Sequence, residues 1–129
     1  MILLDTNVCI RILRRNSEAM QLYLENVGGI ILPAMAVAEL YFGAKRSADP
    51  VRGCGIVDEF VDVVPVVQTN MDILRTFGDL KTNLAAKGEL VGDADTLIAA
   101  TALTLGVPVA TGNVKHFERF PGLRILKVG

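Results

Sequence analysis

The chain contains few of the residues that form disulfides, bind zinc or act as catalytic bases. Its 129 residues include two cysteines and one histidine. Cys9 and Cys54 stand alone without a CxxC spacing, so we expect no disulfide scaffold, no zinc site and a reducing, cytoplasmic location. The single histidine, His116, lies beside neither Ser17 nor Ser47 in sequence, which argues against a Ser–His catalytic triad.

Long apolar runs are also missing, although hydrophobic residues make up 51% of the chain. No run approaches the ~18–20 residues that a membrane span requires. The first apolar stretch, residues 2–4, stops at Asp5, and arginines follow it instead of preceding it, so we expect no signal peptide and no membrane association. A short chain has too small a core to bury this many apolar residues, so we expect some of them to form a surface that is covered by a partner. This expectation favours a homodimer. The residues we expect in that surface are Val27, Met35, Phe42 and Phe60.

The chain has no basic excess. It carries 13 Lys and Arg against 14 Asp and Glu, for a net charge of −1. Because nucleic-acid binders usually carry a basic surplus, the overall charge argues weakly against such a partner. The basic residues are nevertheless clustered, and Arg11, Arg14, Lys45 and Arg46 are candidates for contact with phosphate groups. A solvated surface is the alternative interpretation for each of them.

Short apolar runs alternate with longer helical patterns along the whole chain. Strands are predicted at residues 2–4, 30–32, 63–67, 107–110 and 123–128. Helices are predicted at about 7–15, from an N-cap at Ser17 to near 28, at 34–44, after Pro50, at 70–87 and at 93–105. This alternation predicts one α/β domain over residues 1–129, with three layers and a central parallel sheet. Ligands of such sheets gather at the carboxyl ends of the strands.

Two acidic residues are placed near that edge of the predicted sheet. Asp5 directly follows the first strand, where it either meets a ligand or caps the next helix. Glu39 is the only charged residue between Pro33 and Ala44, in a helix that is otherwise mostly apolar. A carboxylate there is costly to bury without a partner or a metal. The alternative is that Glu39 marks a narrow solvated stripe.

Further oxygen ligands come from the second half of the chain. Asp93 and Asp95 open a predicted helix, and capping is the alternative role, with Asp93 as the better cap. Asn113 follows the strand at 107–110, where a turn residue is the alternative. A cluster of such carboxylates would repel itself unless a divalent cation neutralised it. Oxygen ligands without His or Cys favour Mg²⁺ or Mn²⁺ over zinc.

Three stretches resemble motifs of the PIN-domain family, and within it the VapC toxin type. The first is MILLDTNVCIRILRR, the second is AVAELYFGAKRS, and the third is VGDADTLIAATALTLGVPVATGNVKHFERFPGLRIL. The match covers nearly the whole chain in the family's order and spacing. It implies a PIN-like three-layer fold and a Mg²⁺-dependent endoribonuclease activity, with Mn²⁺ as a substitute.

The resemblance also assigns roles to individual residues. It implies that Asp5, Glu39 and Asp95 are the catalytic metal ligands, with Asp95 chosen because the family's acid directly precedes the "xLIA" run. Asn113 stands where the family often has Asp, so it would hold a metal-bound water without adding charge. Asp93 is an accessory candidate. The family does not require a histidine at position 116, which we expect to be packed or solvated.

The resemblance further implies a biological setting. The chain would be a toxin that cleaves RNA, with transfer RNA as a candidate target, and would be held inactive by a small antitoxin. Contact with promoter DNA would be only indirect, through that antitoxin, and the four clustered basic residues would meet RNA. A different class of function is also open: a catalytically silent PIN module acting as a protein or RNA scaffold. An aspartyl phosphohydrolase with Asp5 as nucleophile is disfavoured because Asn7 stands where a second Asp is usual.

Overall fold

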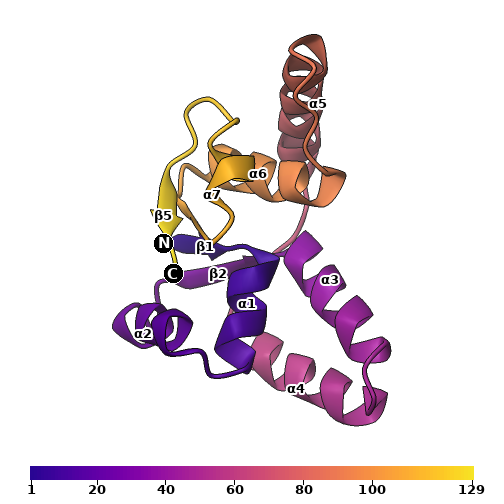
Figure 1. Ribbon diagram of the computed structural model, residues 1–129, viewed down its shortest axis with the longest axis vertical. Helices are drawn as coiled ribbons and strands as arrows, with labels where there is room; N and C mark the ends of the chain where they lie inside the picture. The colour runs from indigo at the N-terminus through magenta and orange to yellow at the C-terminus, as the bar shows by residue number, and fades with distance from the viewer.

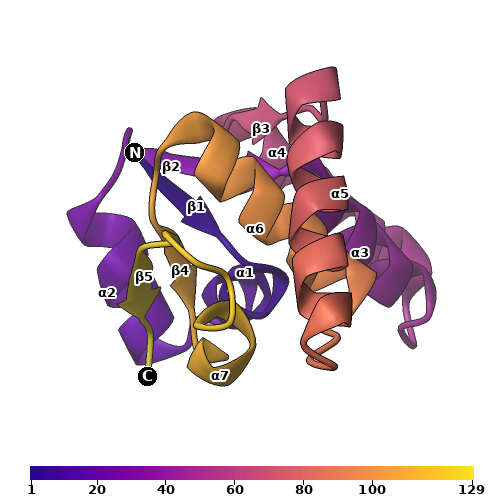
Figure 2. The ribbon, with the colours of Figure 1, turned by 90° about the horizontal axis from the view of Figure 1, so that it is seen from above.

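A parallel five-stranded sheet organises the fold. The computed structural model describes residues 1–129, and its strands lie side by side in the order β3-β2-β1-β4-β5, with every pairing parallel. Figure 1 shows the sheet between the helices, and Figure 2 labels all five strands. The strands are β1 Ile2–Leu4, β2 Ile30–Pro33, β3 Val66–Val67, β4 Val109–Thr111 and β5 Ile125–Lys127.

Helices cover both faces of this sheet. They are α1 Thr6–Leu13, α2 Ser17–Glu25, α3 Ala34–Lys45, α4 Pro50–Val63, α5 Met71–Ala86, α6 Asp93–Leu105 and α7 Val114–Phe117. The helices α1, α2 and α4 lie on one side, and α5, α6 and α7 on the other (Figures 1 and 2). The predicted three-layer α/β/α architecture is therefore confirmed. No helix has the length and apolar character needed to cross a bilayer.

Two hydrophobic cores, one on each face, hold the layers together. The side chains of Leu3 and Leu4 are fully buried, and because strand residues alternate in direction they enter different cores. Leu3 packs in the core that contains Ile98 and Phe117, whereas Leu4 packs in the core that contains Phe60. Burial on both faces explains why the strands appear in the sequence as short continuous apolar runs.

Some predicted boundaries are wrong, and local hydrogen bonds explain the differences. Residues 63–64 end α4 instead of opening a strand, because the Val64 N–H still donates to the Phe60 carbonyl at 3.0 Å. Asn16, and not Ser17, caps α2, since its side chain accepts from the Ala19 N–H. Asn and Ser are equally good caps, so the sequence alone did not separate them. The strand predicted at 107–110 lies at Val109–Thr111.

The topology brings several chain segments to one point. The strand order runs outward from β1 to β2 and β3, and then continues on the other side of β1 with β4 and β5. The order therefore reverses between β1 and β4, and crevices for ligands form at such positions, outside the carboxyl ends of the strands. Because α6 leads into the parallel strand β4, the N-terminus of α6 lies at this same edge. Asp5 follows β1, Asp95 lies in the first turn of α6 and Asn113 follows β4, so all three residues lie at this edge of the sheet.

Candidate active site

Asp5 is the buried centre of the site. It lies between β1 and α1 with 3% of its surface exposed. One carboxylate oxygen accepts the Val8 N–H at 2.9 Å, which caps α1, and the other accepts the Thr111 hydroxyl from β4. Asp5 thus fills the capping role and also spans the reversal point of the sheet, so the two interpretations of this residue are compatible.

No basic side chain forms an ion pair with the Asp5 carboxylate. Burial raises the pKa of Asp5 above its ordinary value of 3.8, and the hydrogen bonds from Thr111 and Val8 offset this only in part. The negative charge of Asp95 raises the pKa further, so the two acids interact electrostatically. A buried carboxylate without a counter-ion favours the binding of a cation.

Glu39 faces the same junction from α3. Its carboxylate accepts the hydroxyl of Thr6 at 2.5 Å, across 33 positions of sequence. Thr6 directly follows Asp5, so this bond places Glu39 beside the start of α1. Glu39 is half-buried and forms no ion pair. The hydrogen bond therefore supports the interpretation as a site residue over that of a solvated stripe.

The structure separates Asp93 from Asp95. The Asp95 side chain is 29% exposed and lies 2.9 Å from Nδ1 of His116. The Asp93 side chain is 67% exposed and pairs with Lys81 of α5 at 3.0 Å. Gly92 occupies the N-cap of α6 and neither acid caps it with its side chain, so the expectation that Asp93 is the better cap is wrong. This arrangement favours Asp95 as the site residue.

A chain of hydrogen bonds connects Asp5 to Asp95. The Thr111 hydroxyl, which contacts Asp5, also accepts the Asn113 N–H at 2.8 Å. The Asn113 amide then lies 2.8 Å from Nδ1 of His116, the atom that contacts Asp95. Asn113 therefore lies between Thr111 and His116 in this network, and its hydrogen bonds are also those of a turn residue.

His116 lies beside two of the candidate site residues, a contact that the sequence did not predict. Its side chain is 49% exposed, in agreement with the expectation that it is packed or solvated, and its Nδ1 atom also contacts Asp95 and Asn113. The available signal was its spacing from Asn113, because residues three apart on one helical turn face each other. A lone histidine matched no metal or triad pattern and therefore did not stand out.

The donor set fits a hard divalent cation, although it is not preassembled. No group of three His, Cys, Asp or Glu side chains lies at metal-binding spacing. Each acid is instead turned onto a local donor: Asp5 onto Thr111, Glu39 onto Thr6 and Asp95 onto His116. Carboxylate oxygens without thiolates suit Mg²⁺ or Mn²⁺.

The four basic candidates differ in how their side chains are used. Arg11 donates to the Val128 carbonyl at 2.9 Å and to the Asn16 side chain at 3.0 Å, so it ties the end of β5 to α1. The Arg46 guanidinium lies 4.6 Å from the centre of the exposed Phe42 ring. Lys45 is exposed in the last turn of α3, and Arg14 is exposed at the end of α1.

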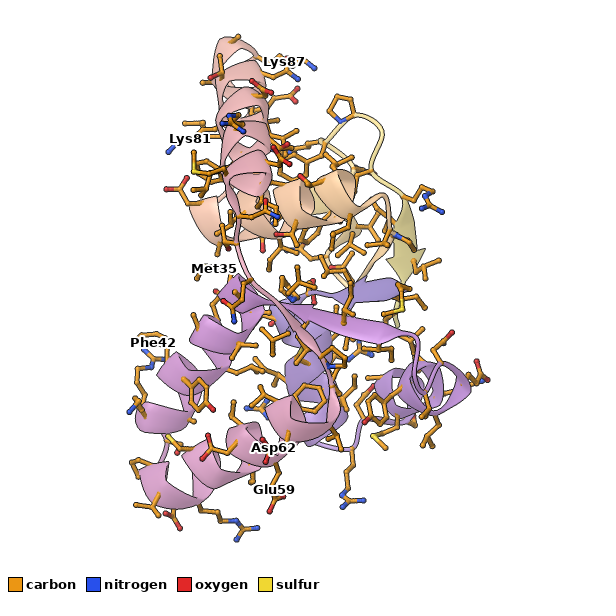
Figure 3. All side chains as sticks on the ribbon, turned by 180° about the vertical axis from the view of Figure 1, so that it is seen from behind. Met35, Phe42, Glu59, Asp62, Lys81 and Lys87 are labelled. Carbon is orange, nitrogen blue, oxygen red and sulfur yellow. The ribbon has the colours of Figure 1, made fainter.

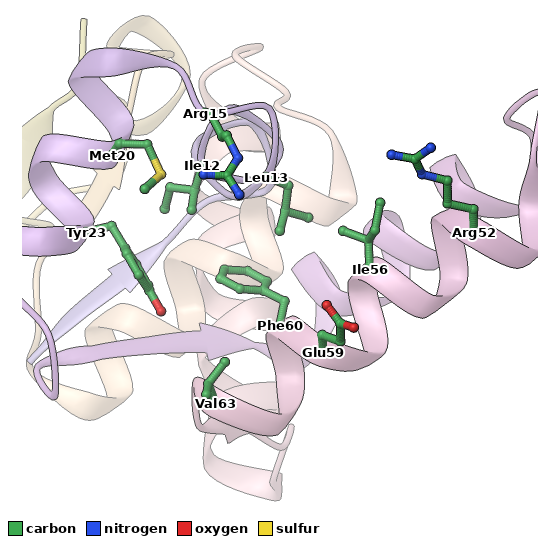
Figure 4. A pocket seen from close by; sticks show the side chains of 10 residues that line it. All are labelled: Ile12, Leu13, Arg15, Met20, Tyr23, Arg52, Ile56, Glu59, Phe60 and Val63. Carbon is green, nitrogen blue, oxygen red and sulfur yellow. The ribbon is translucent and has the colours of Figure 1, made fainter.

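Two hollows with mostly hydrophobic lining residues, which we together name the α1–α4 groove, lie next to α1 and α4. One part, of about 440 Å³, lies between α1, α2 and α4 and is drawn in Figure 4. The other, of about 270 Å³, lies between α1, α3 and α4 and contains Glu39 and Arg14. The two parts share Leu13 and Ile56 in their linings, so they adjoin each other, and the second part contains the catalytic candidate Glu39.

The chain matches the model of a known protein family. The family model described as "PIN domain" matches residues 2–123. The chain therefore belongs to the PIN-domain family, as the sequence motifs implied.

Comparison with individual proteins narrows the assignment. The chain is 32% identical to "Ribonuclease VapC2" of Haemophilus influenzae, over 95% of this chain and 93% of that protein. It is also 32% identical to "tRNA(fMet)-specific endonuclease VapC" of Salmonella typhimurium, over 95% and 94%. The DNA-bound VapBC crystal structure from Salmonella typhimurium contains a chain that is 31% identical, with a TM-score of 0.93 over 98% of this chain and 96% of that one. The chain is thus a member of the VapC ribonucleases within the PIN-domain family.

Proposed function

We propose that this chain is a divalent-metal-dependent endoribonuclease, using Mg²⁺ or, in its place, Mn²⁺. Asp5, Glu39 and Asp95 are the catalytic metal ligands, and Asp93 contributes at most an accessory charge. The observation that carries the proposal is the buried Asp5 carboxylate, which has no cationic partner and senses the charge of Asp95. A catalytically silent scaffold would be served as well by Asn at this position, because Asn also caps a helix and buries no charge.

The chain's own residues hold and orient the reacting groups. When bound, the metal supplies Lewis acidity, which activates a water and offsets charge on the scissile phosphate. Asp5 is fixed by two hydrogen bonds, and Thr6 orients Glu39. Asn113 is neutral, so its role is to hold water. No protein nucleophile is needed for this reaction.

The RNA backbone would reach the site along the basic side chains near it. Arg14 lines the same part of the groove as Glu39, and Lys45 and Arg46 end the helix that carries Glu39. Arg14 and Lys45 form no side-chain hydrogen bond or ion pair, and Arg46 contacts only the Phe42 ring, so these three can contact phosphates. Arg11 is also a candidate, but its guanidinium donates to the Val128 carbonyl. We take transfer RNA as the target class because one relative is named for a transfer RNA.

A small antitoxin protein is the proposed partner, because the similar Salmonella structure is a VapBC complex bound to DNA. An apolar segment of such a partner would fill the α1–α4 groove, and a basic side chain at its end would reach Glu39. DNA contact would then be indirect, through the antitoxin.

We also propose a homodimer, with Met35 and the exposed Phe42 of α3 in the interface between the two copies (Figure 3). Phe60 is 6% exposed and packs in a core, so its predicted place in that surface is wrong.

The direct test is incubation of the purified chain with total RNA, followed by mapping of the new ends. We expect cuts at a small number of positions, enriched in transfer RNA, with Mg²⁺ or Mn²⁺ and none with EDTA. Glu39→Gln, purified in parallel, controls for contaminating nucleases. Identical ends from the variant and the original protein, or no cuts with either metal, would favour the silent-scaffold interpretation.

A further inference from the structure

The imidazole of His116 lies within hydrogen-bond distance of two candidate site residues, Asp95 and Asn113. Its Nδ1 atom is 2.9 Å from Oδ2 of Asp95 and 2.8 Å from Nδ2 of Asn113. The neighbouring Phe117 is fully buried and anchors α7 to the core. The backbone that carries His116 is therefore fixed, although its side chain is 49% exposed.

The contact with Asp95 determines which ring nitrogen of His116 carries the hydrogen. An ionised carboxylate only accepts hydrogen bonds, so the 2.9 Å contact requires Nδ1 of His116 to donate to Asp95. Two donors would then face each other at Asn113. Turning the Asn113 amide by 180°, which exchanges its oxygen and nitrogen, lets its oxygen accept from the same hydrogen. His116 is thereby a shared donor to Asp95 and Asn113.

This donor fixes one oxygen of Asp95 and leaves the other available. Oδ2 is the atom bonded to His116, and Oδ1 makes no hydrogen bond within the protein. Through Asn113 and Thr111 the same network continues to Asp5. Hydrogen bonds of this kind orient carboxylate ligands, and their loss typically costs ~10–100-fold in metal affinity or activity.

We infer that His116 is a positioning residue, whose Nδ1–H holds the Asp95 carboxylate and the Asn113 amide in the orientation that receives the divalent cation. This inference rests on the proposed function for the identity of the cation site. It assigns a role to a side chain that does not itself touch the cation or the RNA.

Three substitutions at one position test the inference. His116→Asn keeps a donor at the place of Nδ1, because the amide nitrogen is attached at the same carbon position. His116→Gln places its amide near the position of Nε2 instead, and His116→Ala removes both. The main readout is the dissociation constant for Mn²⁺ measured by electron paramagnetic resonance on the protein without RNA. The kcat and KM for RNA cleavage are measured in parallel, and thermal melting checks the fold.

We expect His116→Ala and His116→Gln to weaken Mn²⁺ binding by about 10-fold, and His116→Asn to stay within about threefold of the original protein. At limiting metal kcat should fall in the first two variants, with KM for RNA unchanged. Unchanged Mn²⁺ affinity in His116→Ala would overturn the inference. Failure of Asn to rescue would also overturn it, because it would indicate that the imidazole contacts the cation directly.

The outcome separates this inference from the proposed function. If the protein cuts RNA while all three variants bind Mn²⁺ normally, the positioning role fails and the ribonuclease assignment stands. If Mn²⁺ binding depends on His116 as expected but RNA is never cut, the ribonuclease assignment fails and the positioning role stands.

Discussion

Replacing Asp5 with Asn should stabilise the metal-free protein while abolishing its response to Mg²⁺. The carboxylate is buried with no counter-ion, and its pKa is raised by that burial, so its ionised form opposes folding at neutral pH. Asn caps a helix as well as Asp, so the bond to Val8 should persist. The amide can also face the Thr111 hydroxyl, with the donor reversed.

The expected gain is about 1 kcal/mol, an ordinary size for a single substitution, or roughly 4 °C in Tm for a domain of this size. The sign of its pH dependence follows from the raised pKa of Asp5. The folded state binds the proton more tightly than the unfolded state, so the original protein loses stability as pH rises from about 3.8 through the folded pKa. The advantage of Asn should therefore be full at pH 7 and disappear in acid.

Bound Mg²⁺ should make the original protein more stable than Asp5→Asn, the reverse of the order expected without metal. With Mg²⁺ at 100 times its dissociation constant, the original protein gains about 2.7 kcal/mol, whereas Asp5→Asn gains little. Chemical denaturation with EDTA or with Mg²⁺, at pH 7 and near pH 4, measures both effects. Asp79→Asn is the matched control, because Asp79 is an exposed acid of α5 without a hydrogen-bond partner. A less stable metal-free Asp5→Asn protein at pH 7, or an undiminished Mg²⁺ response, would refute the reasoning.

Three other outcomes follow from the surfaces of the molecule. Phe42, 61% exposed on α3, should lie in the dimer surface, so sedimentation should show a dimer that Phe42→Glu dissociates; a monomeric original protein at micromolar concentration would contradict this. Ile56→Lys, in the shared part of the α1–α4 groove, should weaken antitoxin binding at least 10-fold without slowing RNA cleavage. An antitoxin that inserts an Arg or Lys among the acids should bind more weakly at high Mg²⁺, and equal calorimetric affinities at low and high Mg²⁺ would exclude that insertion.

Much of the fold and of the acidic set was predictable because local patterns determined both. The run at residues 2–4 ends abruptly at Asp5, and a parallel sheet places such a residue at its carboxyl edge. Glu39 stood out because a lone charge in an apolar helix needs a partner, and Thr6 provides it. The choice of Asp95 over Asp93 came from the family motif, and the structure adds a physical difference in exposure.

What the sequence did not predict depends on contacts between distant segments. Asp93 pairs with Lys81, 12 positions earlier in the chain, and Asp95 contacts His116, 21 positions later. The role of Arg11 is set by the Val128 carbonyl, 117 positions later in the chain. Backbone contacts of this kind leave no pattern in a single sequence, since any residue supplies a carbonyl.

The most direct test of the central claim compares Asp95→Asn with Asp93→Asn in Mg²⁺-dependent RNA cleavage under single-turnover conditions. The two substitutions remove the same charge two residues apart on α6, but only Asp95 lies within the hydrogen-bonded network that includes Asp5. We expect Asp95→Asn to lower the cleavage rate at least 100-fold and Asp93→Asn to lower it less than about fivefold, amounts that correspond to roughly 2.7 and 1 kcal/mol of transition-state stabilisation. An inactive Asp93→Asn beside an active Asp95→Asn would contradict the assignment of the site.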